Sequence, residues 1–485
     1  MSIADFMLWA ILVPFAGAIL ISQLGRWPNL REAASLITAT FLIVVIATIY
    51  QRFQEGEPGR LVLAEPIPGI SIAFSVEPLG MLFAIIASSL WLVTTIYAIG
   101  YMRGHHEKNQ TRFFTTFAVA IAGTMGIIFA DNLFTLFIFY EFLTISTYPL
   151  VVHAGSEKAR RNGRVYLGIL MATSIGLMLP AMIVIWANTG TLEFSSGGII
   201  AEKIDPAWVL PLYLLFIFGI GKAAVMPLHR WLPAAMVAPT PVSALLHAVA
   251  VVKAGVFSIL KVTIYIFGPD VIIDNGVNEW IIWLPAITIL LASLIAMTRD
   301  NLKERLAYST ISQLSYIVLG AVLANQMGLL GGSLHIAMHA FAKITLFFAA
   351  GAILVATHKT EVSQLNGLGY QMPFTFIFFA IGAASIIGLP PLGGMWSKWY
   401  LALGTVEAEQ WALLGVLMIS SLLNIAYLLV IPVRAFFVKP GQTVSEGIKE
   451  APVTCLIGML IPSLMCIYLF FHPEPFYSLA QTVSR

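Results

Sequence analysis

The sequence predicts an all-α protein that crosses a membrane about fourteen times. Apolar residues make up 59% of the chain and charged residues only 10%, far below the roughly 25% typical of a soluble protein. The apolar residues are gathered into runs long enough to span a bilayer. No hydrophilic stretch between these runs is long enough to fold by itself, so we expect one membrane domain over residues 1–485.

Short polar connections, such as 51–60 and 156–164, separate the apolar runs. The first run lacks a basic start and a small-residue cleavage site, so we expect it to be retained as the first span. The predicted crossings are 4–24, 32–51, 77–101, 113–130, 132–152, 165–187, 209–228, 241–267, 279–298, 304–323, 328–357, 372–404, 410–437 and 452–472.

Lysine and arginine are shared unevenly between the two sets of alternate connections. One set holds seventeen of them: Arg26, Arg31, Arg103, Lys108, Arg112, Lys158, Arg160, Arg161, Arg164, Arg230, Arg299, Lys303, Arg305, Lys359, Arg434, Lys439 and Lys449. The other set, which includes both termini, holds only Arg52, Arg60, Lys203 and Arg485. Connections rich in lysine and arginine stay in the cytoplasm, so we expect the set that includes both termini to lie outside it. Two termini on the same side require an even number of crossings.

The remaining basic residues fall inside predicted crossings: Lys222, Lys253, Lys261, Lys343 and Lys398. At 1.5 Å per residue, Lys222 lies about 18 Å beyond Leu210 and Lys253 about 18 Å beyond Pro241. Both ammonium groups therefore fall near the middle of a hydrocarbon core about 30 Å thick. A charge at that depth is costly and indicates a function. Lys261 lies nearer the outer end of its helix, and we expect its side chain to snorkel toward water.

Glu141 is the one acidic residue that the sequence places clearly inside a crossing, about 14 Å from Asn132. One carboxylate among buried lysines suits a proton relay. Burial favours the neutral form of each group, whereas a close contact between glutamate and lysine favours the charged forms. Changing the distance between the two groups can therefore load or release a proton. We expect Glu141 to lie within ion-pairing distance of Lys222, and Glu141→Ala or Lys222→Ala to abolish transport without preventing insertion. The alternative is a structural ion pair with no part in transport.

Histidines extend this candidate path. His335, His339 and Lys343 are spaced i, i+4 and i+8, so they share one helix face. The alternatives are simple polar packing and a zinc-binding pair, although no third ligand accompanies the histidines. Cys455 and Cys466 indicate neither a disulfide framework nor a metal site. We expect one polar line across the middle of the bundle, formed by Lys222, His247, Lys253, His335, His339, Lys343 and Lys398.

Prolines interrupt two of the predicted helices. Pro227 and Pro233 follow Lys222, and Pro390 and Pro391 precede Lys398. Proline removes a backbone donor and ends a regular helix, which is tolerated at membrane depth only inside protein or beside a cavity. Interrupted helices at corresponding places in two halves are typical of inverted-repeat transporters.

Four segments carry a family resemblance: GKAAVMPLHRWLPAAMVAPTPVSALLHAVAVVKAG, LKERLAYSTISQLSYIVLG, HIAMHAFAKITLFFAAG and IIGLPPLGGMWSKW. They resemble the proton-translocating antiporter-like family, which comprises large membrane subunits of respiratory complex I and of Mrp-type cation/proton antiporters. The likeness runs from about Glu77, where the family commonly has aspartate, to Phe437. It implies fourteen helices, with helices 1–3 in 1–112, two inverted five-helix repeats in 113–267 and 279–437, and helix 14 in 452–472.

The resemblance also implies roles for individual residues. Glu141 matches the glutamate of helix 5 and Lys222 its partner on broken helix 7. Lys253 matches the connecting lysine of helix 8, and Lys398 the terminal lysine of broken helix 12. His247, His335 and His339 match histidines along the same axis.

The chain looks most similar to the D-type Mrp subunit because of Lys398, its length and the absence of a long lateral helix. That likeness implies a proton-conducting subunit of a Na⁺/proton antiporter in a prokaryotic cell membrane, assembled with other membrane subunits. The alternatives are a proton-pumping subunit of a complex I-like NADH:quinone oxidoreductase or membrane-bound hydrogenase, and a subunit of an inorganic-carbon uptake system. No cofactor, metal or nucleic-acid partner is expected.

Overall fold

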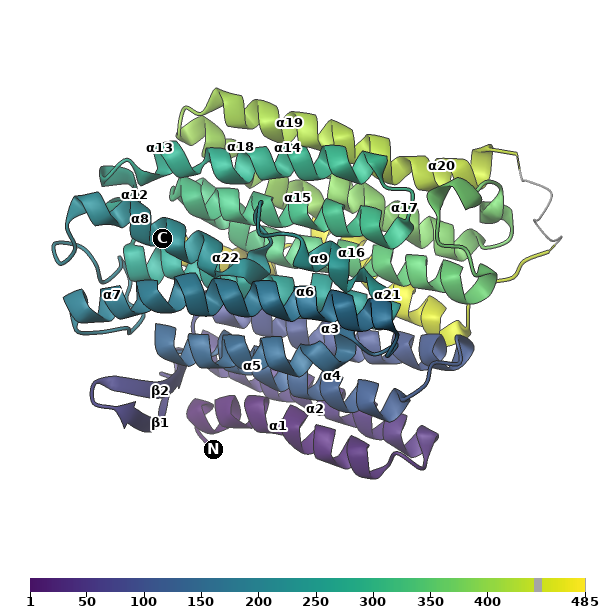
Figure 1. The fold of residues 1–485 in the computed structure, drawn as a ribbon, viewed down its shortest axis with the longest axis horizontal. Helices are drawn as coiled ribbons and strands as arrows, with labels where there is room; N and C mark the ends of the chain where they lie inside the picture. The colour runs from purple at the N-terminus through teal and green to yellow at the C-terminus, as the bar shows by residue number, and fades with distance from the viewer. Residues whose placement is uncertain (440–446, 485) are drawn as a thin grey trace.

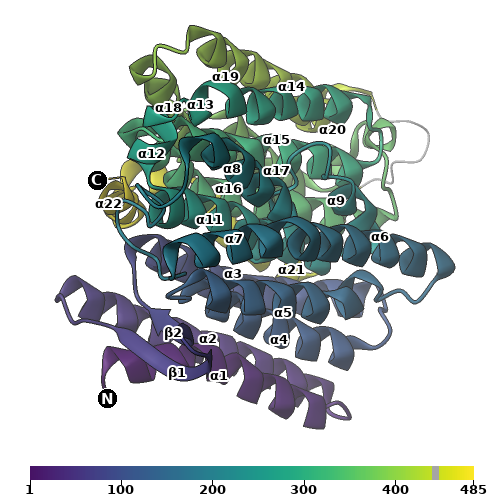
Figure 2. The ribbon, with the colours of Figure 1, turned by 60° about the vertical axis from the view of Figure 1, so that its left-hand side comes forward.

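The computed structural model describes residues 1–439 and 447–484; Arg485, counted above among the sparse basic residues, lies outside this range. The helices lie side by side in one bundle, with both chain ends toward the same end of it (Figures 1 and 2). Within the described residues, 12 helices are long and apolar enough to cross a membrane, and Pro206–Gly219 and Pro373–Ile387 are shorter apolar helices. These two are the first parts of the interrupted crossings. The predicted all-α class, with about fourteen crossings and breaks in the seventh and twelfth, is confirmed.

The N-terminal part holds three long helices and a hairpin that the sequence analysis did not predict. The elements are α1 (Ile3–Gln23), α2 (Pro28–Gln54), β1 (Arg60–Ile67), β2 (Ile70–Ser75) and α3 (Pro78–Gly104). The two strands are antiparallel and pair Arg60 with Ser75 and Ile67 with Ile70. Gly69 closes the turn between them with a φ of 80°, a value that favours glycine.

The middle of the chain contains the first interrupted crossing. Its helices are α4 (Gln110–Ile128), α5 (Leu133–Val151), α6 (Glu157–Thr173), α7 (Leu179–Thr189), α8 (Pro206–Gly219), α9 (Trp231–Ala234), α10 (Thr240–Ala244) and α11 (Val251–Lys261). A π-helical turn joins α6 to α7 into one crossing, and another joins α10 to α11. Helix α6 begins at Glu157 rather than near 165, because Ser156 caps it by accepting a hydrogen bond from the Ala159 N–H. The basic stretch after Ser156 is therefore helical.

The C-terminal part contains the second interrupted crossing. Its helices are α12 (Pro269–Asp274), α13 (Val277–Ile281), α14 (Trp283–Thr298), α15 (Leu302–Leu323), α16 (Gln326–Thr357), α17 (Pro373–Ile387), α18 (Gly394–Glu407), α19 (Trp411–Asn424), α20 (Val430–Phe437), α21 (Val453–Phe471) and α22 (Glu474–Val483). The predicted crossing 372–404 is thus two helices. Gly388, with a φ of 93°, ends the first of them, and Pro390 and Pro391 cannot continue it.

Helix α16 lies at the centre of the bundle, with α1 and α2 on one side and α19 on the other (Figure 1). It packs against α3, α15, α17, α18 and α21, and most of its residues are buried. A Cβ on Gly331 would lie 2.6 Å from the backbone nitrogen of Leu401, so glycine is what lets α16 approach α18 closely. Polar side chains on α16 are therefore enclosed by other helices and shielded from lipid.

Candidate functional site

Lys222 lies in a short 3-10 turn directly after α8 and is fully buried. Its Nζ donates hydrogen bonds to the Tyr140 carbonyl oxygen at 2.8 Å and the Thr144 hydroxyl at 2.6 Å. The same ammonium lies 3.1 Å from the centroid of the Tyr140 ring. The Lys222 backbone N–H also donates to the Tyr140 hydroxyl, at 3.0 Å. Helix α5 thus holds both the backbone and the charge of Lys222.

The predicted ion pair between Glu141 and Lys222 is wrong for this conformation: no ion pair joins them in the described part of the chain. Tyr140 and Thr144 are one turn apart on α5 and face Lys222, whereas Glu141 is turned about 100° away from Tyr140 around the helix. Both Glu141 carboxylate oxygens are buried, and neither has a hydrogen-bond partner among the described residues. Glu141 therefore has free acceptor oxygens next to Tyr140, the residue that binds Lys222.

Close packing fixes the segment that carries Lys222. The Trp231 indole donates to the Gly221 carbonyl oxygen at 2.9 Å, and its ring meets the Tyr166 ring edge-on with centroids 5.6 Å apart. On the opposite side, a Cβ on Gly255 would lie 2.4 Å from the Lys222 carbonyl carbon. Gly255 therefore lets α11, which carries Lys253, pack directly against the Lys222 backbone.

Lys253 starts a second polar cluster in the centre of the bundle. Its Nζ lies 2.6 Å from Nδ1 of His339 on α16. When Lys253 is charged its ammonium can only donate, so Nδ1 of a neutral His339 ring is then the acceptor and the ring proton lies on Nε2. The His335 ring is one helical turn away, with centroids 5.8 Å apart, and His335 Nδ1 lies 2.8 Å from the Ser397 hydroxyl on α18. The predicted face of α16 thus meets both α11 and α18.

The cluster continues from His335 to Lys398. The Tyr316 ring stacks on His335 at 5.7 Å between centroids, and the Lys398 Nζ lies 4.9 Å from the Tyr316 ring centroid. Lys398 also donates to the Ser421 hydroxyl and the Ile387 carbonyl oxygen, each at 3.1 Å. Lys253, His339, His335, Tyr316 and Lys398 form a series of neighbouring side chains, called here the central chain. It runs across the helices from α11 to α18.

Lys398 borders a hollow of about 330 Å³ between α18 and α19. Tyr316 and Ser421 line the same hollow, together with the apolar residues Met418 and Leu422. Met418 and Leu422 are largely exposed on the outside of the bundle. The Lys398 end of the central chain is therefore only partly buried, unlike Lys253 at the other end.

Lys343 and His247 lie beside the central chain. Lys343 Nζ donates to the Ser309 hydroxyl at 2.6 Å, and the Tyr427 hydroxyl oxygen lies 3.0 Å from the same oxygen. The His247 ring packs on Phe347 with centroids 4.4 Å apart. Neither of its ring nitrogens has a hydrogen-bond partner among the described residues. Lys343 is thus hydrogen-bonded to side chains next to the central chain, whereas the buried His247 ring makes no hydrogen bond within the described residues.

Of the seven residues expected to form one line, four lie in the central chain, Lys343 and His247 lie beside it, and Lys222 lies apart from it. Lys253, His335, His339 and Lys398 lie in the central chain, while Lys222 is bonded to α5. In the part of the chain that the structure describes, no side-chain hydrogen bond joins Lys222 to Lys253. The backbone contact at Gly255 is what brings the Lys222 segment and the central chain together.

Lys261 does not snorkel. It is fully buried, and its Nζ lies 2.7 Å from a Glu77 carboxylate oxygen and donates to the Ala130 carbonyl oxygen at 2.6 Å. Glu77 stands at the start of α3, where the chain leaves the hairpin. Glu77 stands directly before Pro78 and the apolar run of α3, and this position was the available signal for a buried carboxylate at the start of that helix.

Glu32 is a further buried carboxylate that sequence reasoning missed, so Glu141 is not the only one in a crossing. It is 4% exposed and pairs with Arg31 at 3.2 Å and Arg103 at 2.5 Å. Uncharged residues were missed too: Ser309, Gln313 and Tyr316 of α15 are buried beside α16. Their near-helical spacing along LAYSTISQLSY was the available signal.

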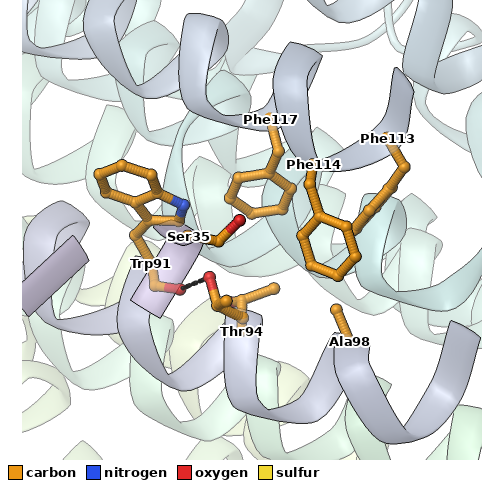
Figure 3. Close-up of a pocket in the computed structure, with 8 residues that line it drawn as sticks. Ser35, Trp91, Thr94, Ala98, Phe113, Phe114 and Phe117 are labelled. Atoms are coloured by element: carbon orange, nitrogen blue, oxygen red, sulfur yellow. Dashed lines mark hydrogen bonds between the residues drawn. The ribbon is translucent and has the colours of Figure 1, made fainter. Parts of the chain in front are cut away.

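Another hollow lies between α2, α3 and α4 and is filled largely by aromatic rings (Figure 3). Trp91, Phe114 and Phe117 line it so tightly that no water molecule fits. The Thr95 hydroxyl at its edge already donates to the Trp91 carbonyl oxygen at 2.9 Å. This region is therefore closely packed and offers no room for a ligand. His335 and His339 have no third histidine, cysteine or carboxylate near enough to complete a metal site within the described residues.

Known proteins resemble this chain over nearly its full length. Residues 130–424 match the family model described as NADH:quinone oxidoreductase/Mrp antiporter, transmembrane, and residues 68–114 match that of the complex I chain 5 N-terminus. NADH-quinone oxidoreductase subunit N of Desulforudis audaxviator is 31% identical over 89% of this chain and 87% of its own length.

Two solved assemblies contain chains of the same fold. A chain of the Mrp complex from a Dietzia species superposes with a TM-score of 0.86 at 22% identity, covering 99% of this chain and 97% of that one. A chain of an archaeal membrane-bound sulfane sulfur reductase superposes with a TM-score of 0.87 at 23% identity over the same shares. Together with the buried lysines, these matches show that the chain belongs to the NADH:quinone oxidoreductase/Mrp antiporter family of membrane subunits.

Proposed function

We propose that this chain is the proton-conducting subunit of a multisubunit Mrp-type Na⁺/proton antiporter. The central chain is the observation that carries the proposal. It places two lysines and two histidines, all of which can bind and release protons, close to one another across the interior of the bundle. Packed apolar residues alone would give a proton no site at this depth.

The first transfer is between Lys253 and His339. The Lys253 ammonium gives its proton to His339 Nδ1, 2.6 Å away, and the ring releases the proton held on Nε2. His335 is the next acceptor, across a distance that one bridging water spans. From His335 the proton reaches Lys398 through water along the face of the Tyr316 ring, whose hydroxyl donates to the Leu417 carbonyl oxygen. We place the proton exit at Lys398, where a neighbouring subunit has to cover the hollow between α18 and α19 because its outer wall, Met418 and Leu422, is apolar.

Glu141 and Lys222 control proton entry into the first repeat, 113–267. In this conformation Lys222 is bonded to Tyr140 and Thr144, and Glu141 is free. Movement of the Lys222 turn toward Glu141 would form the ion pair and release the α5 contacts. Because α11 packs on the Lys222 backbone through Gly255, that movement also shifts Lys253 and thereby gates proton entry.

The two breaks fit a pair of inverted repeats, 113–267 and 279–437, with one water-filled entry in each. The uneven sharing of basic residues supports a chain with both termini outside the cytoplasm of a prokaryotic cell. Other membrane subunits would pass the coupled Na⁺ or share its path.

A redox-driven proton pump is the second candidate, favoured by the relative that is a subunit of NADH-quinone oxidoreductase. The central chain would serve a pump equally well, with electron transfer in a partner as the driving force. The proteins that co-purify with the chain distinguish the two: small membrane subunits alone favour the antiporter, and iron–sulfur or flavin subunits favour the pump.

Replacing His339 by phenylalanine tests the proposed path. The change removes the acceptor of Lys253 while keeping a planar ring, and we expect proton flux in membrane vesicles to fall at least tenfold, equivalent to about 1.4 kcal/mol or more. His472→Phe, at the exposed end of α21, is the matched control and should keep the wild-type flux. Undiminished flux in His339→Phe vesicles would remove the central chain from the mechanism.

A further inference from the structure

A hollow of about 640 Å³ lies between the beginning of α6 and the segment that leads into α9. Lys158, Arg161 and Asn162 line it from α6, and Arg230 lines it from the other side. Val165 and Ile169 continue the same wall toward the middle of α6. The spacing of the α6 residues, i, i+3, i+4, i+7 and i+11, places them along one face of the helix.

The three cations in this hollow lack ion-pair partners among the described residues. None of the lining residues is acidic. Three like charges held together without a counter-charge create a local positive potential that attracts anions. The hollow is therefore suited to a negatively charged ligand that reaches Lys158, Arg161 and Arg230 at once.

The apolar wall narrows the choice of anion. Val165 and Ile169 extend from the cations into the span, and Gly168 between them has open space beside it. A free phosphate ion would bind the three cationic side chains but make no contact with Val165 and Ile169. A phospholipid fills both, because basic hollows between membrane helices at the headgroup level bind anionic lipid head groups.

We propose that this hollow binds an anionic phospholipid, with its phosphate among Lys158, Arg161 and Arg230 and an acyl chain along Val165 and Ile169. The site lies beside the first broken crossing. Arg230 directly precedes Trp231, whose indole is bonded to the Gly221 carbonyl next to Lys222. Helix α6 supplies Tyr166, which meets the Trp231 ring. The bound lipid thus ties α6 to the segment that holds Lys222.

The binding test uses the intact complex purified in detergent. Lys158→Gln/Arg161→Gln removes two charges from the hollow, and Arg160→Gln/Arg164→Gln removes two exposed charges from the same helix outside it. Bound lipid is measured by native mass spectrometry after adding phosphatidylglycerol, phosphatidylcholine of the same chains, or inorganic phosphate. We expect phosphatidylglycerol affinity to fall at least tenfold in the first variant and to stay within twofold in the second. Arg230→Gln should weaken it as well.

Three results would overturn the proposal. The first is an equal loss of bound phosphatidylglycerol in the two double variants. The second is displacement of the lipid by inorganic phosphate at equal concentration. The third is loss of a protein subunit from the Lys158→Gln/Arg161→Gln complex while lipid binding stays unchanged. The last result would assign the hollow to an acidic protein partner. The melting temperature of each variant in lipid-free detergent verifies that it is folded.

A transport measurement, which rests on the proposed function, extends the test. We expect proton flux in proteoliposomes to rise at least twofold when phosphatidylglycerol is added to phosphatidylcholine, and the rise to disappear in Lys158→Gln/Arg161→Gln. A rise of equal size in that variant contradicts the link to the Lys222 segment. Absence of flux from the wild type in both lipids would reject the proposed function and leave the binding result intact.

Discussion

Replacing Lys398 by arginine is expected to stop proton transport as completely as replacing it by alanine. Arginine keeps the positive charge, but its guanidinium holds its proton too tightly to release it at physiological pH. Lys398 is the last member of the central chain and borders the hollow between α18 and α19, so every proton on this path passes through it. Flux should be measured with a pH-sensitive dye in inverted vesicles, after the amount of assembled complex has been equalised.

Lys203→Arg provides the control, because Lys203 is exposed in the connection between α7 and α8 and is not a member of the central chain. It should transport like the wild type. If Lys398→Arg also transports like the wild type, Lys398 supplies only a charge, and the last step of the path is incorrect. If Lys398→Ala alone retains flux, the proton leaves the chain before reaching α18.

Replacing Lys261 by methionine should destabilise the protein by about 3–5 kcal/mol. The change leaves the Glu77 carboxylate without the ammonium 2.7 Å away and removes the hydrogen bond to the Ala130 carbonyl oxygen. An unpaired buried carboxylate keeps its desolvation cost without the compensating attraction. Unfolding of the purified protein in mixed micelles, followed by circular dichroism, measures the difference.

The double variant Glu77→Gln/Lys261→Met separates the pair from simple packing. Removing both charges also removes the uncompensated carboxylate, so most of the lost stability should return. Lys203→Met, an exposed lysine, should change stability by less than about 0.5 kcal/mol. Equal stability of the single and double variants would show that the ion pair contributes nothing and that Lys261 acts through its aliphatic part.

The sequence alone determined the crossings, the interruptions in two of them and the lysines and histidines buried inside them. A helix in lipid must satisfy its backbone hydrogen bonds within itself, so length and hydrophobicity identify each crossing without knowledge of its neighbours. Proline acts just as locally, which is why interruptions near Lys222 and Lys398 could be predicted, although α8 already ends at Gly219, before Lys222. The face shared by His335 and His339 follows from helical spacing alone.

Only the tertiary structure decided which groups meet. Lys222 is bonded to Tyr140 and Thr144 rather than to Glu141, and Lys261 pairs with Glu77. Tyr316 links His335 to Lys398 although it carries no charge. A hydrogen bond requires atoms within about 3 Å, and rotating α5 by one residue would exchange Tyr140 for Glu141. That rotation is set by packing between helices far apart in the sequence, which no single crossing encodes.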